Sequence, residues 1–279
     1  MTRRSLVVFT AVAVIVATAV SACGTQATPT AITSAGAGQP SSGRAVATRQ
    51  VGNCLDGTSS SASYYAPRIQ AVLAEAVAAW ASRPPANLIA GVPAQLGLHF
   101  VLRSVTTTSY STDGPSVDTT IPAVSALAPQ PSPSTDPSFD ADIHTWTQGL
   151  PAWKQTASSA AAAAAELSAK VRQYSVARNT WSAIYSCVSA AARQLIPSQG
   201  ADTRLAVISD MENNEPVVGL SLAGAAVLLV TICPADVSTG CPQRFATAST
   251  YLMHHGASSV QIVSADAVTP QTFDDFWRA

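Results

Sequence analysis

The segment Ala225-Ala-Val-Leu-Leu-Val-Thr-Ile232 carries no charge and, as a strand, would present apolar side chains to both faces of a sheet. Parallel strands that helices cover on both faces have this composition. Arg204-Leu-Ala-Val-Ile-Ser209 is similarly apolar, and Ser259-Val-Gln-Ile-Val263 predicts a third strand. A helix over 244–255, ended by Gly256, separates the last two strands. Strands that alternate with helices in this way predict an α/β fold with a doubly wound, mainly parallel sheet flanked by helices.

The chain before these strands adds further elements of the same fold. A strand over 49–55 precedes a helix over 64–82, whose apolar residues recur at helical spacing. Apolar residues alternate over 96–103, which predicts a strand with one well-buried face. Residues 117–124 predict an edge strand that stops at Pro122, because proline cannot donate to a central ladder.

The middle of the chain contains an insertion over about 125–175. Its first part, 125–142, is rich in Pro, Ser, Asp and Ala, which predicts a surface loop. Alanine dominates residues 150–173, so we expect a long helix there, followed by a second helix over 180–195. A short helix at the C-terminus should pack back on the body of the domain through Phe273, Phe276 and Trp277.

The N-terminus has the layout of a bacterial export signal. It starts with Arg3 and Arg4 and continues with an apolar run over 6–20 that is too short for a comfortable membrane span. The following Ser21-Ala22-Cys23 resembles the lipobox of bacterial lipoproteins, whose new N-terminal cysteine is acylated. The resemblance implies a signal peptide over 1–22 and a fatty-acylated Cys23, so that lipid alone holds the protein at the extracytoplasmic face of the cell membrane. The alternative is an ordinary signal peptide with a chance cysteine.

The residues after the signal divide into a tether and a folded domain. Residues 23–43 are mostly Gly, Ala, Thr, Ser, Pro and Gln, which cannot bury enough surface to fold. We therefore expect one domain over 44–279. Removal of Arg3 and Arg4 with the signal leaves 13 basic residues, from 15, against 16 acidic residues. With so little net charge and no basic cluster, we expect no nucleic-acid partner.

The cysteines fit an exported protein. Cys233 and Cys241 bracket a short loop between a predicted strand and helix, so we expect them to form a disulfide, with Cys54 and Cys187 left as a second pair. A zinc site is the weaker alternative, because the chain has no Cys-x-x-Cys spacing.

Polar side chains follow two of the predicted strands. Asp56, Thr58 and Ser60 alternate directly after the first strand, Thr180 opens a predicted helix, and Asp210 follows the strand that ends at Ser209. Because ligands of doubly wound sheets bind beyond the carboxyl ends of the strands, we expect these side chains to converge there. The set contains only oxygen donors and two carboxylates, which favours Mg²⁺ or Mn²⁺ over softer metals. A Ser-rich turn that caps a helix is the alternative.

Together these residues resemble the metal-ion-dependent adhesion site of the von Willebrand factor A (integrin I-like) domain. That site reads Asp-x-Ser-x-Ser, then a Thr at a helix start, then an Asp after a strand. The resemblance implies that Asp56, Thr58 and Ser60 contact a metal ion or its waters. It also implies that Thr180 joins when a ligand is bound, that Asp210 acts through water, and that an open coordination position accepts a carboxylate from a partner protein.

Three features depart from the family pattern. Thr58 stands where the first Ser is usual, which keeps the hydroxyl ligand and adds a methyl group. Met211 replaces the glycine of the usual Ser-Asp-Gly, which changes the turn after Asp210. The insertion over 125–175 is not part of the minimal domain.

The sequence therefore predicts a lipid-anchored, extracytoplasmic protein-binding module. One alternative is a degenerate scaffold of the same fold that binds no metal. A hydrolase is a weaker alternative, because the serines near Asp56 lack a base and no Gly-x-Ser-x-Gly elbow is present, so we expect no enzyme activity. A solute-binding lipoprotein would need two similar α/β lobes, and one set of strands is visible.

Overall fold

A computed structural model of the chain describes residues 48–57, 65–82, 93–106, 116–125, 127, 130–133, 135, 137–177, 182–195, 203–212, 219–233 and 240–279. All of them belong to the compact unit Ser42–Ala279. The predicted signal peptide, the tether and the predicted lipidation site Cys23 lie outside the described residues. In the described part of the chain, no helix is both long and apolar enough to cross a membrane.

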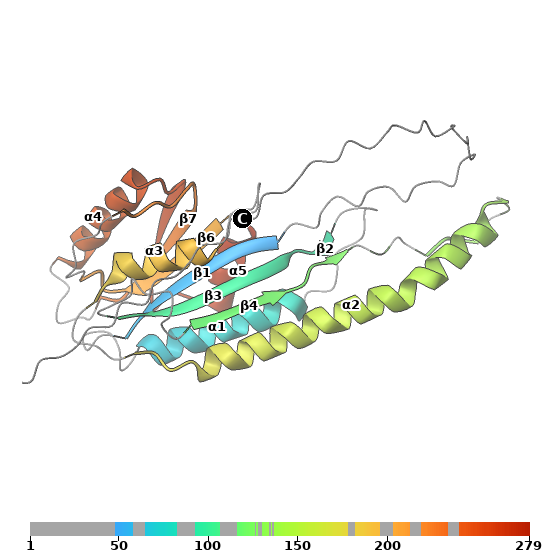
Figure 1. Ribbon diagram of the computed structural model, residues 1–279, viewed down its shortest axis with the longest axis horizontal. Helices are drawn as coiled ribbons and strands as arrows, with labels where there is room; N and C mark the ends of the chain where they lie inside the picture. Colours follow the sequence, from blue (N-terminus) through green and yellow to red (C-terminus); the bar gives the residue numbers. More distant parts are fainter. Residues whose placement is uncertain are drawn as a thin grey trace, which may run out of the picture. The chain divides into compact units, whose positions relative to one another are not determined.

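A six-stranded sheet forms the centre of the fold (Figure 1). Its strand order is β4-β3-β1-β6-β7-β8, and every neighbouring pair is parallel except β3 and β4. The strands are β1 (Thr48–Asp56), β3 (Gly97–Val105), β4 (Ser116–Ile121), β6 (Thr203–Ser209), β7 (Ala226–Thr231) and β8 (Ser259–Ser264). The sequence-based prediction of a doubly wound, mainly parallel α/β sheet is therefore confirmed. A small antiparallel pair, β2 (Pro93–Gln95) and β5 (Val124–Ser125), lies outside this sheet.

Helices cover both faces of the sheet and enclose two apolar cores. The core on one face is formed with α1 (Tyr65–Ser82), α2 (Phe139–Gln173) and α5 (Pro270–Arg278). The core on the other face is formed with α3 (Ile184–Gln194) and α4 (Cys241–His254). Strands that are covered in this way must be apolar on both faces, which explains the apolar segments that form β6 and β7.

The C-terminal helix α5 packs on the sheet as its aromatic residues predict. Trp277 is fully buried, and its ring centroid lies 5.8 Å from that of Phe100 on β3 and 6.4 Å from that of Trp80 on α1. Both ring pairs are edge-on, an arrangement that aromatic quadrupoles favour. Thr269 caps the helix by accepting a hydrogen bond from the backbone N–H of Thr272.

Two elements differ from the sequence-based prediction. Strand β3 is buried on both faces rather than one, because it lies inside the sheet between β1 and β4 with helices on both sides. Helix α2 begins at Phe139, inside the segment that we predicted as a loop. Asp140 and Asp142 in its first turn complement the helix dipole, and the helix continues through Pro151.

Helix α3 begins four residues later than predicted. Its first residue is Ile184, and the preceding Ala183 has the non-helical dihedral angles φ −99° and ψ 63°. The prediction that Thr180 opens this helix is therefore wrong. Ser182 and Ala183 instead form a buried, non-helical entry to the helix.

Two disulfides are present, and each joins a strand region to a helix. Cys54 of β1 is bonded to Cys187 of α3, and Cys233, which follows β7, is bonded to Cys241 at the start of α4. The first bond ties α3 to the central strand β1.

Candidate functional site

The carboxyl ends of β1 and β6 lie side by side at the point where the sheet changes its winding direction. From β1 the chain crosses to β3 on one side, whereas β6, β7 and β8 follow one another on the other side. Leu55 is in register with Ile208, so Asp56 at the end of β1 is level with Ser209 at the end of β6, and Asp210 lies one residue further along. The two aspartates therefore lie at the same edge of the sheet, at the ends of adjacent strands. Open α/β sheets bind their ligands at such a switch point.

Two serine hydroxyls hold the Asp56 carboxylate. Asp56 is fully buried, and its Oδ2 atom accepts a hydrogen bond of 2.7 Å from the Oγ atom of Ser209, the last residue of β6. Ser182, in the entry to α3, donates to the two carboxylate oxygens at 3.3 Å and 3.5 Å. Burial of a carboxylate is costly unless donors compensate the lost water, which these two hydroxyls do in part.

A tight turn follows Asp210. The Asp210 side chain is buried, and its Oδ1 atom accepts a 3.0 Å hydrogen bond from the backbone N–H of Glu212. Met211, between them, has a φ of 59°, and its N–H donates to Ser209 Oγ at 2.9 Å. Ser209 therefore links the two aspartates, because its hydroxyl donates to Asp56 and accepts from the backbone beside Asp210.

Gly57 fixes the exit from β1. A Cβ atom at this position would lie 2.3 Å from the carbonyl oxygen of Ala177 and 2.6 Å from the Val176 side chain, so a larger residue does not fit. The N–H of Ala177 in turn donates to Ser104 Oγ at the end of β3. The segment that leads from α2 toward α3 is thus packed directly against the turn after Asp56.

The structure brings together only part of the predicted ligand set. Asp56 and Asp210 share one edge of the sheet, whereas Thr58, Ser60 and Thr180 lie outside the described residues. The sequence reasoning did not predict Ser182 and Ser209 as partners of Asp56. The register of β1 and β6 could have suggested Ser209 as a partner, because it is level with Asp56. The contact of Ser182 with Asp56 depends on where α3 begins.

The donor chemistry around Asp56 and Asp210 fits a hard divalent cation. Two carboxylates and serine hydroxyls supply only oxygen, the donor type that Mg²⁺ and Mn²⁺ prefer. Within the described residues, no group of three or more His, Cys, Asp or Glu side chains could hold a metal ion. A cation here would therefore depend on these two carboxylates, on hydroxyls and on water.

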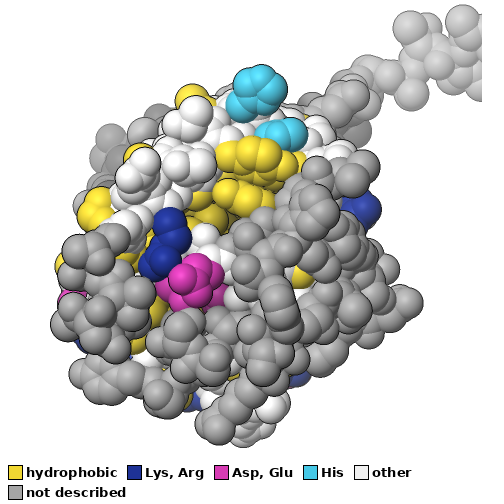
Figure 2. Space-filling view, turned by 90° about the vertical axis from the view of Figure 1, so that its left-hand side faces the viewer, with side chains coloured by type: hydrophobic (Ala, Val, Ile, Leu, Met, Phe, Trp, Pro, Cys, Tyr) yellow, Lys and Arg dark blue, Asp and Glu magenta, His cyan; other side chains and the backbone are white. Residues whose placement is uncertain are grey.

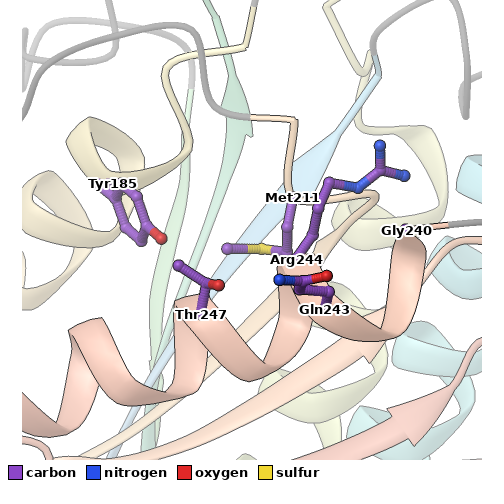
Figure 3. Close-up of a pocket in the computed structure, with 6 residues that line it drawn as sticks. All are labelled: Tyr185, Met211, Gly240, Gln243, Arg244 and Thr247. Atoms are coloured by element: carbon purple, nitrogen blue, oxygen red, sulfur yellow. The ribbon is translucent and has the colours of Figure 1, made fainter.

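A pocket of about 460 Å³ adjoins this edge between α3 and α4 (Figure 3). The described residues that line it are Tyr185, Met211, Gly240, Gln243, Arg244 and Thr247. At its rim Arg244 Nη1 lies 2.9 Å from Glu212 Oε1. Glu212 belongs to the turn that follows Asp210, so this ion pair connects α4 to that turn. Figure 2 looks onto this edge and shows acidic and basic side chains in contact beside a run of hydrophobic side chains.

Burial and a neighbouring tyrosine raise the pKa of Tyr185, the tyrosine that lines this pocket. Loss of water around the Tyr185 side chain, followed by the electrostatic effect of Tyr251, raises the pKa of Tyr185 to about 12. The two rings are 4.5 Å apart between centroids. At neutral pH Tyr185 keeps its hydroxyl proton, as an unperturbed tyrosine also does, and it can both donate and accept a hydrogen bond.

No protein-family model matches the chain, and no curated protein sequence is significantly similar to it. The function must therefore be argued from the geometry at the carboxyl edge of the sheet.

Proposed function

We propose that this chain is a lipid-anchored, extracytoplasmic protein-binding module of the von Willebrand factor A type. In this proposal a divalent cation at the carboxyl edge of the sheet, Mg²⁺ or Mn²⁺, takes a carboxylate of a partner protein as a ligand. The observation that carries the proposal is the pair of buried aspartates, Asp56 and Asp210, at adjacent strand ends of the switch point. The proposal assigns a binding role rather than catalysis.

The roles of the residues follow from their positions. Asp56 would supply the main negative charge, with Thr58 and Ser60 as hydroxyl ligands from the turn that follows it. Asp210 and Thr180 would complete the site, directly or through water. Two carboxylates balance the charge of one divalent ion, and a bound cation supplies an open position that attracts an acidic side chain. Ser182 and Ser209 would orient Asp56 by donating hydrogen bonds to it.

A second candidate function is a metal-free scaffold of the same fold. The specific observation in its favour is that Asp56 already accepts hydrogen bonds from two hydroxyls. Those contacts compensate part of the desolvation of the carboxylate without a cation. In that case the edge of the sheet would bind a partner through hydrogen bonds and packing alone.

Thermal unfolding in the presence of a divalent cation separates the two candidates. A cation that binds only the folded protein stabilises it by about 2.7 kcal/mol at one hundred times its dissociation constant. We expect Mg²⁺ and Mn²⁺ at millimolar concentration to raise the Tm of the wild-type protein, and Asp56→Asn and Asp210→Asn to remove this increase. Circular dichroism of each variant in EDTA reports whether the fold is kept.

Asp266→Asn is the matched control, because Asp266 lies just beyond β8 at the same edge of the sheet and is exposed. It should keep the metal-dependent rise in Tm. A wild-type Tm that does not respond to either cation, with folded variants that behave the same way, would show that the metal-free scaffold is correct.

A further inference from the structure

We infer that the pocket between α3 and α4 binds an aromatic side chain of the protein partner, next to the position that takes the carboxylate. This inference deepens the proposed function and rests on it for the partner being a protein. The affinity of the pocket for an aromatic ring needs no metal, however, so the two proposals can fail separately.

Two of the lining groups favour an aromatic guest. The thioether of Met211 contacts ring edges favourably, and the ring of Tyr185, which already packs on Tyr251, can meet a second ring edge-on. In Figure 3 the Tyr185 hydroxyl and the Met211 side chain point into the same space above α4, and Thr247 borders it. An aliphatic guest would gain packing from these groups but none of their ring-specific attraction.

The polar groups of the pocket fit a ring with a polar tip. Tyr185 stays protonated, and Gln243 and Thr247 add an amide and a hydroxyl at the wall. These groups can pair with the hydroxyl of a tyrosine or the indole N–H of a tryptophan, which otherwise lose a hydrogen bond on burial.

The charge of the pocket argues against an acidic guest. Arg244 is the one charged residue among the described lining residues, and Glu212 pairs with it at 2.9 Å. A free carboxylate would have to compete with Glu212 for the guanidinium. A neutral ring leaves this ion pair intact.

The location links the pocket to the aspartate pair. Met211 lines the pocket and directly follows Asp210, so the pocket opens beside the aspartate pair. The volume of about 460 Å³ falls within the roughly 300–1,000 Å³ that ligand pockets usually have. The recognition element is therefore an acidic residue with a tyrosine or tryptophan close by in sequence.

The methionines of the chain provide a direct test. The chain has three, and of these Met211 lines the pocket whereas Met253 is exposed on α4. Protein purified from cells that express the full chain would be labelled with [methyl-¹³C]methionine and titrated in EDTA with N-acetyl-tyrosinamide or N-acetyl-tryptophanamide. We expect a saturable ring-current shift of the Met211 methyl signal that is several-fold larger than that of Met253. N-acetyl-leucinamide should shift Met211 no more than it shifts Met253.

Two exposed positions on α4 give a matched pair of variants. Thr247→Trp places a ring in the pocket, because Thr247 lines it. Ala246→Trp places a ring at the preceding position of α4, which is also exposed and is not among the described lining residues. The first should shift the Met211 signal without any added amide and weaken the response to the aromatic amides at least several-fold, and the second should do neither. Equal shifts of Met211 and Met253 with the aromatic amides, or equal effects of the leucine and aromatic amides, would overturn the inference. Because EDTA is present, a metal site that fails leaves this readout unchanged.

Discussion

At the scale of single residues, Met211 combines two opposing contributions to stability. Its φ of 59° places a side-chain-bearing residue in the left-handed region, which costs about 1–2 kcal/mol. Its side chain is buried against the core between the sheet, α3 and α4. Burial of a methionine side chain contributes about 1.5–3 kcal/mol, so burial outweighs the strain. This balance explains how a methionine can occupy a turn in which glycine would be free of strain.

The substitution Met211→Gly should therefore destabilise the protein although it relieves strain. Loss of a buried methionine side chain costs about 2–5 kcal/mol, and relief of the left-handed strain returns about 1–2 kcal/mol. We expect urea denaturation to show a net loss of up to about 4 kcal/mol in the free energy of unfolding. Met211→Leu, which keeps both burial and strain, should cost less than about 1.5 kcal/mol. A Met211→Gly variant more stable than the wild type would mean that backbone strain dominates at this turn.

At the scale of elements, α2 has two halves with different environments. Its buried residues all lie in the C-terminal half and pack against α1 and the sheet: Ala160, Ala164, Leu167, Ser168 and Val171. Gln70 of α1 anchors the end of the helix by donating hydrogen bonds to three backbone carbonyls. The N-terminal half extends beyond the sheet (Figure 1), with Trp153 attached to the Ser125 carbonyl at 2.9 Å.

Leucine truncations in the two halves should therefore differ in cost. Leu167 is fully buried, so Leu167→Ala should lower the free energy of unfolding by about 2–5 kcal/mol. Leu150 is only partly buried and lies in the extended half, so Leu150→Ala should cost about 1 kcal/mol or less. Urea denaturation of the two variants checks this, and equal losses would contradict the division of α2 into a packed and an extended half.

At the scale of the whole molecule, the two disulfides close loops of very different length. Cys54 and Cys187 are 133 positions apart in sequence, whereas Cys233 and Cys241 are 8 apart. The first bond connects the central strand to a helix of the second half, and the second bond closes only the connection from β7 to α4. A cross-link restricts the unfolded chain more strongly when its loop is longer.

Removal of the long-range disulfide should consequently have the larger effect. In the loop-entropy treatment, the Cys54–Cys187 bond contributes about 5 kcal/mol and the Cys233–Cys241 bond about 2.5 kcal/mol. We expect Cys54→Ala with Cys187→Ala to lower the unfolding free energy more than Cys233→Ala with Cys241→Ala, as measured by guanidinium denaturation without reductant. The reverse order would show that native-state strain, rather than loop length, determines the contribution of each bond.

Several features could be predicted from the sequence because they depend on local pattern. The apolar runs that became β6 and β7 predict strands buried on both faces, and the helical spacing of apolar residues predicts α1 almost to its ends. The positions of Asp56 and Asp210 after their strands follow from the same runs, because parallel strands end at one edge of a sheet. Each of these features depends on residues that are neighbours in the chain.

Other features depend on contacts between distant parts of the chain, so tertiary structure alone decided them. Strand β3 alternates in sequence yet is buried on both faces, because its place inside the sheet covers the second face as well. Ser182 reaches Asp56 because α3 begins at Ile184 and the preceding residues stay non-helical, a boundary that the sequence pattern placed at residue 180. The pocket beside Asp210 forms where α3 and α4 meet. The physical reason is the same in each case: periodicity records which side of an element is apolar, whereas register and packing determine which residues meet across elements.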